Sequence, residues 1–134
     1  MEENQIPAES DAEFVRLPDA ELEVMLAVWK CEPPVTTARL MRLIDPDKHW
    51  KAPTLISFLQ RLENRGFLTA EKHGREYTYE PVIARADYVG ALTKSFLRRV
   101  HSNSLSSFLN AAYGDVGFTD AEIDDLLFYL ERRG

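Results

Sequence analysis

Only one cysteine, Cys31, occurs in the 134 residues of the chain. No disulfide can form within the chain and a single thiol cannot hold a zinc ion, so disulfide-stabilised secreted scaffolds and cysteine-ligated zinc fingers are excluded. The sequence also lacks a run of about 18 apolar residues, the length that a membrane-spanning helix needs. Its first residues are acidic and lack the basic region and apolar run of a secretory signal. These absences predict a cytoplasmic protein with no membrane insertion.

Motifs for catalysis and for cofactor binding are missing as well. The sequence contains no glycine-rich phosphate loop, no nucleophile elbow and no carboxylate–histidine motif. Its three histidines, His49, His73 and His101, lie in separate predicted elements without the paired spacing of metal ligands. We therefore predict that the protein is not an enzyme and that it takes no metal and no cofactor.

The charge of the chain is unevenly distributed. The formal net charge is −6, which by itself argues against a nucleic-acid partner. Residues 33–101, however, hold twelve basic and seven acidic side chains, whereas residues 1–32 and 102–134 are both acidic. Local charge decides the approach of an anionic partner, because screening limits its range to about 8–10 Å. The basic middle segment is compatible with such a partner and equally with an ordinary solvated surface.

Residues 1–16 are acidic and lack apolar periodicity, which predicts a mobile tail. A helix is expected from about residue 18 to residue 30, where Pro33 and Pro34 end it. Its predicted buried face consists of Leu22, Met25, Leu26 and Trp29. A residue or two of strand at Val35 and a short second helix capped by Thr36 follow.

The third predicted helix spans about residues 52–64, with Gly66 just beyond its end. Leu55, Leu59 and Leu62 form its apolar stripe. Residues 67–80 then alternate between apolar and polar around His73-Gly74-Arg75, which predicts a β-hairpin. Three short helices followed by a hairpin with a basic tip are typical of a winged helix-turn-helix domain, here residues 17–82. In that fold the third helix enters the major groove of DNA and the wing lies along the backbone.

A polar stripe of the third helix is the predicted DNA-recognition surface. Thr54, Ser57 and Arg61 lie away from the leucines, and hydroxyl and guanidinium groups bind base edges or phosphates. Arg75 at the hairpin tip, Lys51 and Lys72 are predicted phosphate contacts. The complete predicted DNA-binding set is Thr36, Arg39, Lys51, Pro53, Thr54, Ser57, Arg61, Lys72 and Arg75. The same polar residues also suit the solvated face of an amphipathic helix.

Residues 83–134 are predicted to be helical and to mediate dimerisation. A long helix is expected from about residue 84 to residue 100, then a short one, and a capping box at residues 119–122 begins the last. So small a lobe cannot bury its many large apolar side chains internally, and a second copy of the chain would cover them. The predicted dimerisation residues are Leu92, Phe96, Val100, Leu105, Phe108, Leu126, Leu127 and Leu130. The predicted fold is therefore mainly α with a small β-hairpin wing, followed by a helical dimerisation lobe.

Four segments in this order resemble the penicillinase repressors of the BlaI/MecI type. They are the first helix at residues 17–29, the third helix at residues 50–62, the wing residues Gly74-Arg75, Tyr77-Thr78-Tyr79 and Pro81, and the stretch Ser95–Val100 with Ser104-Leu105. The resemblance covers about residues 17–134. It implies a transcriptional repressor that binds double-stranded DNA as a homodimer at an inverted-repeat operator, with an inducing protease or sensor as a further partner.

The sequence departs from this family in three places. Pro53 stands where the family commonly has lysine or a similar polar residue, which removes a possible phosphate contact. The cleavage pair of the lactam-responsive members would fall near Phe108-Leu109. The chain ends in residues 130–134 without the cysteine-rich tail of the copper-responsive members, so copper sensing by that tail is excluded.

Two other functions remain open from the sequence. The winged helix could use its basic face to bind another protein, or the helical lobe could hold a small ligand in a ligand-sensing regulator.

Overall fold

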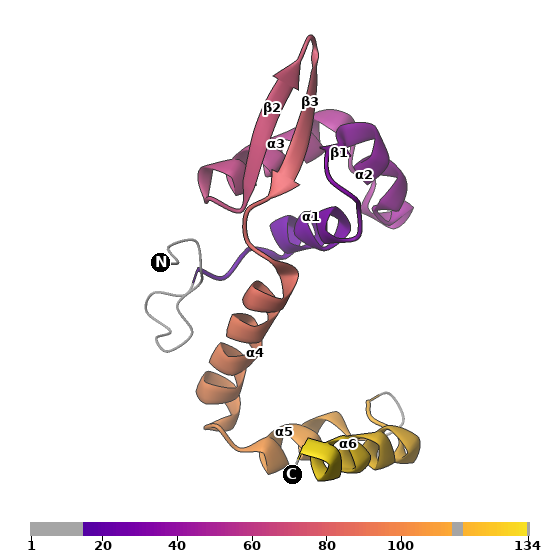
Figure 1. Cartoon of the computed structure of the whole chain (residues 1–134), viewed down its shortest axis with the longest axis vertical. Helices are drawn as coiled ribbons and strands as arrows, with labels where there is room; N and C mark the ends of the chain where they lie inside the picture. Colours follow the sequence, from indigo (N-terminus) through magenta and orange to yellow (C-terminus); the bar gives the residue numbers. More distant parts are fainter. Residues whose placement is uncertain (1–14, 114–116, 134) are drawn as a thin grey trace. The chain divides into compact units, whose positions relative to one another are not determined.

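The computed structural model describes residues 15–113 and 117–133, so the predicted tail over residues 1–16 lies almost entirely outside the described residues. The described chain is mainly helical with a small antiparallel sheet, as predicted (Figure 1). The elements are α1 Asp19–Trp29, β1 Val35–Thr36, α2 Thr37–Leu43, a 3-10 turn Pro46–Lys48, α3 Ala52–Asn64, β2 Leu68–His73, β3 Glu76–Pro81, α4 Arg85–His101, α5 Leu105–Ala112 and α6 Asp120–Arg133. The chain divides into two compact units, residues 1–92 and 93–134.

The first unit is a winged helix-turn-helix domain. Its sheet has the order β1-β3-β2, and both pairings are antiparallel. The predicted hairpin is β2 and β3, with His73 paired to Glu76 at its tip. The short strand expected at Val35 forms and pairs with Tyr79, so it adds a third strand to the hairpin. This pairing ties the base of the wing to the start of α2.

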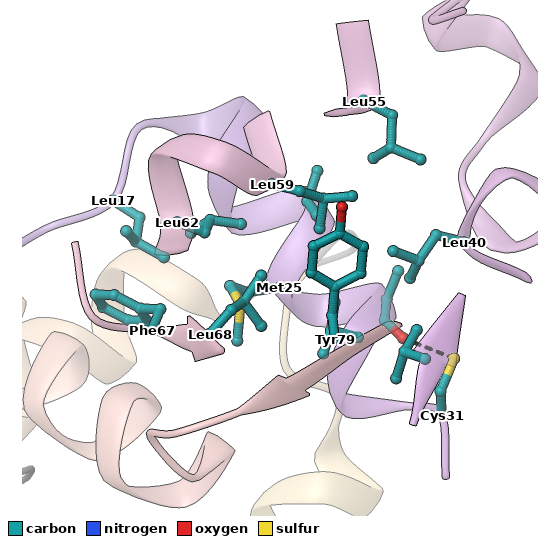
Figure 2. Packing of buried hydrophobic residues seen from close by; sticks show 14 of the residues in the cluster. Leu17, Met25, Cys31, Leu40, Leu55, Leu59, Leu62, Phe67, Leu68 and Tyr79 are labelled. Carbon is teal, nitrogen blue, oxygen red and sulfur yellow. Dashed lines mark hydrogen bonds between the residues drawn. The ribbon is translucent and has the colours of Figure 1, made fainter. Parts of the chain in front are cut away.

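One apolar core fills the first unit (Figure 2). The α3 leucines Leu55, Leu59 and Leu62 are completely buried, which confirms the predicted stripe of that helix. Cys31 is buried too, and its thiol donates to the carbonyl of Ala27 at 3.4 Å.

The predicted buried face of α1 is only partly correct. Val24, Met25 and Val28 are completely buried, whereas Leu22, Leu26 and Trp29 are only half-buried. The helix contacts α2, α3 and β3, so it is enclosed on more than one side. A single stripe of apolar residues does not describe a helix that is covered in this way.

The boundary between the units lies within α4, after Leu92, whereas the sequence suggested a boundary between residues 82 and 83. Tyr88 explains the difference, because its completely buried ring packs edge-on against Phe67 with centroids 5.5 Å apart. Its hydroxyl also accepts a hydrogen bond from the Leu17 amide at 2.8 Å. Leu92 packs half-buried against the same core, so part of its surface already has a partner within the subunit.

The second unit contains the end of α4 together with α5 and α6. A chain of aromatic contacts runs through it, from Phe96 to His101, then to Phe108 and to Phe118, with centroids 5.2, 5.7 and 5.9 Å apart. Among its described residues, Ser95 is the only one that is buried. The apolar side chains that the structure describes in this unit are therefore all at least partly open to solvent.

Candidate nucleic-acid interface

Helix α3 presents a polar face opposite its buried leucines. Thr54 and Arg61 are exposed and Ser57 is half-buried. A row of side chains that recurs every three or four residues lies most directly opposite the leucines, and it consists of Pro53, Ser57, Gln60 and Asn64. Gln60 and Asn64 are exposed, and amides of this kind can bind adenine through two hydrogen bonds. The sequence reasoning missed both, although the spacing of the leucines was sufficient to find them.

Basic and aromatic groups lie at the start of α3 and along one flank of the helix as far as its last turn. Lys51 is the N-cap residue of the helix and is exposed. The Arg61 guanidinium lies 5.8 Å from the ring centre of Phe58, and that ring packs against Trp50 at 5.0 Å. Lys48 lies 5.9 Å from the Trp50 ring centre. The aromatic pair therefore holds two cations beside the polar face, and Lys48 was not among the predicted contacts.

Thr36 has a local structural task. Its hydroxyl accepts a hydrogen bond from the Arg39 amide at 3.1 Å and so caps α2. Arg39 itself is exposed on the first turn of that helix. Of these two predicted contacts, Arg39 therefore offers the free donor groups, while Thr36 positions the helix.

The wing ends in a tight turn that exposes Arg75. Gly74 has a φ of 65° and is the first of two residues between His73 and Glu76, a position at which hairpin turns favour glycine. Lys72 lies 6.0 Å from the Tyr77 ring centre on the exposed part of the hairpin. The Tyr77 ring stacks on that of Tyr79 with centroids 6.4 Å apart. Tyr79 is buried, so it anchors the exposed end of the wing to the core.

The basic side chains of the predicted DNA-binding set are not neutralised by nearby acidic groups that the structure describes. In the described part of the chain, none of Arg39, Lys51, Arg61, Lys72 and Arg75 forms an ion pair with an acidic group. Arg65, in contrast, donates from Nε to Glu21 Oε1 at 2.7 Å. Basic side chains without acidic partners beside the exposed polar face of a helix are typical of surfaces that bind both the phosphates and the base edges of DNA.

A groove of about 440 Å³ lies beside this face. It is lined by the first turn of α2, by Ile56 of α3 and by wing residues that include Arg75 and Tyr77. Within the described residues no cluster of three His, Cys, Asp or Glu side chains could hold a metal ion. None of the helices in these described residues has both the length and the apolarity to span a bilayer.

Comparison with known proteins gives the family. The sequence model of the penicillinase repressor family matches residues 17–132. The penicillinase repressor of Bacillus licheniformis is 31% identical over 116 residues, which are 87% of this chain and 90% of that protein. The methicillin resistance regulatory protein MecI of Staphylococcus aureus strain N315 is 21% identical over 123 residues, 92% of this chain and 99% of MecI. The solution structure of the DNA-binding domain of the repressor BlaI is 34% identical and covers 55% of this chain and 88% of its own, with a TM-score of 0.47.

The order of the three helices and the three-stranded sheet define a protein of the winged-helix class. The chain belongs to the penicillinase repressor family, a family of transcriptional repressors and not of enzymes, as the sequence predicted.

Proposed function

We propose that the protein represses transcription in the cytoplasm as a homodimer bound to an inverted-repeat operator in double-stranded DNA. The observation that carries the proposal is the polar face of α3, which lies opposite Leu55, Leu59 and Leu62 and is bordered by unpaired cations. In the proposed complex α3 enters the major groove with Thr54 and Ser57 toward the bases. The wing lies along the backbone, where Arg75 contacts phosphate.

The second unit supports the homodimer. Its described residues enclose no dry core, and several large apolar side chains on α4, α5 and α6 are about half exposed. They are Phe96, Val100, Leu105, Leu127 and Leu130 from the predicted dimerisation set. Phe108 and Leu126 are half-buried, and Leu92, the eighth member, belongs to the first unit and packs half-buried against its core. Exposed apolar surface of this kind favours association, and two-fold symmetry matches two half-sites about one helical turn apart.

Induction by proteolysis stays a prediction. The position that resemblance gives to the family's cleavage pair, Phe108-Leu109, lies within α5 and both side chains are half-buried. A protease needs an extended segment, so α5 would have to open locally before cleavage there.

Salt dependence of binding distinguishes DNA from a protein partner. If each subunit neutralises about three to five phosphates, the plot of log affinity against log salt for the dimer should have a slope of roughly −5 to −9. Titration of the purified full chain with promoter DNA at several salt concentrations measures the slope. A nearly flat response would favour the alternative in which the basic face binds another protein.

Substitutions separate base recognition from backbone anchoring. Thr54→Ala or Ser57→Ala should change the relative affinity among operator variants by about 1–3 kcal/mol, because a base contact is lost. Arg75→Ala should weaken binding to all sequences alike and reduce the salt slope by about one unit per subunit. Matched titrations over operator variants at two salt concentrations test both expectations. If Arg75→Ala alone changes the sequence preference, α3 is not the recognition helix.

A further inference from the structure

Ile56 is an apolar side chain in an otherwise polar setting. It is 38% exposed and is the only large hydrophobic residue of α3 that is exposed. It directly precedes Ser57 and follows the buried Leu55, so it lies on the flank of the helix between the core and the polar face. Ile56 is not part of the buried core, and an exposed aliphatic side chain at this position does not improve solubility as a polar one would.

The surroundings of Ile56 combine apolar surface with groups that suit a nucleic-acid strand. Ile56 lines the groove of about 440 Å³ together with Thr37, Tyr77 and Arg75. The Tyr77 ring is 44% exposed, and Lys72 lies over it. Glu76 also lines the groove, so its polar border carries one acidic and one basic group. The basic groups Arg75 and Lys72 outnumber this acid around the exposed Tyr77 ring.

We propose that Ile56 recognises the 5-methyl group of a thymine in the operator, while the sugar of the same strand lies against Tyr77 in the groove. The proposal rests on the proposed function, in which α3 occupies the major groove. The thymine methyl is the apolar group that a base presents there, and aliphatic side chains bind it by direct contact. The groove is lined by polar and charged groups as well as by Ile56, Lys72 lies over its Tyr77 ring, and Ile56 directly precedes Ser57; this mixed border favours a DNA strand over an apolar peptide as the occupant.

The proposed methyl contact predicts how much the affinity for the operator should fall when the methyl group is removed. Burial of one methyl group changes affinity by about fourfold. In a dimer that contacts two symmetric half-sites, loss of both methyl groups should weaken binding by about 16-fold. Deoxyuridine lacks the 5-methyl group of thymidine but keeps all of its polar atoms. A change from thymidine to deoxyuridine therefore leaves every hydrogen bond and phosphate contact in place and tests the methyl contact alone.

The experiment uses the full chain and an operator selected by the protein from a random-sequence pool. Each thymine is replaced by deoxyuridine in turn, at the same position of both half-sites, and the affinity is measured for each duplex. Three proteins are compared: the natural chain, Ile56→Ala, and Leu43→Ala as the matched control. Leu43 is an exposed leucine of α2, 44% exposed, that does not line the groove.

At one thymine position the natural chain and Leu43→Ala should lose about 16-fold in affinity, whereas Ile56→Ala should bind both duplexes equally. At the other thymines all three proteins should respond alike. If sequence-selective binding occurs and no position shows a methyl effect that depends on Ile56, this proposal is overturned and the proposed function stands. If the natural chain selects no sequence from the pool, both proposals fail. A loss of methyl discrimination in Leu43→Ala as well would also overturn the role of Ile56.

Discussion

The buried carboxylate of Glu21 joins α1 to the C-terminal end of α3. It is 2% exposed and receives a hydrogen bond from Arg65, whose side chain keeps 35% of its surface exposed. Without Arg65 the carboxylate would be left unpaired inside the protein, whereas without Glu21 the guanidinium can turn toward water. Arg65→Ala should therefore lower the free energy of unfolding by about 2 kcal/mol, and Glu21→Leu by less than about 1 kcal/mol. Urea unfolding measures both, and an equal or larger loss for Glu21→Leu would contradict this account.

Two buried tyrosines make the winged domain sensitive to high pH. Burial raises the pKa of Tyr88 above its ordinary value of 10.0, and the hydrogen bond from Leu17 and the charge of Arg16 oppose this shift. Burial also raises the pKa of Tyr79, against a weaker opposing hydrogen bond with Thr37. The folded chain therefore holds these protons more tightly than the unfolded chain does. Their contribution to stability is complete below pH 10 and is lost as the pH rises through the folded pKa values.

Tyr88→Phe isolates one of these contributions. The variant should be less stable by about 1–2 kcal/mol near neutral pH, because the Leu17 amide loses its buried acceptor. It should then lose less stability than the natural chain between about pH 8 and about pH 10.5, since one titrating group is gone. Urea unfolding at both pH values gives the comparison. An identical loss in the two proteins would show that Tyr88 does not titrate differently on unfolding.

At the scale of elements, the end of α3 depends on backbone conformation. Gly66 follows α3 and has a φ of 88°. Residues that carry a Cβ atom adopt this left-handed backbone conformation only with steric strain. Gly66→Ala should destabilise the protein by about 1 kcal/mol, although its Cβ would meet no other atom within 4 Å.

Gly90 offers the matched control within α4. It also has no atom within 4 Å of an added Cβ, but its φ is that of an ordinary helix residue. Gly90→Ala should stabilise the protein by about 0.5–1 kcal/mol, because alanine has the higher helix propensity. Thermal unfolding of the two variants should shift in opposite directions, and a shift in the same direction would contradict the conformational argument.

At the scale of the whole molecule, the α6 leucines should separate dimerisation from folding. Leu127 is 53% exposed, so Leu127→Asp costs the isolated subunit little but places a charge in the proposed interface. Leu126 is half-buried within the second unit, so Leu126→Asp should weaken both the fold and the dimer. Sedimentation at tens of micromolar should show a dimer for the natural chain and mainly monomer for Leu127→Asp.

Leu43→Asp is the control for this measurement, because Leu43 is an exposed leucine of the first unit. It should leave the dimer intact. The monomeric Leu127→Asp variant should also bind the full operator more weakly, since two linked half-sites gain from effective concentration. A monomeric natural chain at these concentrations would overturn the dimer proposal.

The sequence by itself determined the order of the helices and strands and the buried face of α3. Prolines, glycines and caps mark element ends through contacts within a few residues, and the leucine spacing of α3 is equally local. The same local pattern predicted a hairpin with Gly74 and Arg75 at its tip. It failed for the deepest face of α1, because three other elements enclose that helix.

Only the tertiary structure decided which distant residues meet. The Tyr88 hydroxyl contacts a backbone amide 71 positions away, and Glu21 contacts Arg65 across 44 positions. Neither contact has a periodic signal, because each depends on how elements pack and not on the spacing within one element. The position of Ile56 in a groove with the wing is of the same kind. The spacing of apolar residues in a helix predicts which side chains lie outside the core. Which residues of other elements those side chains contact depends on how the elements pack together.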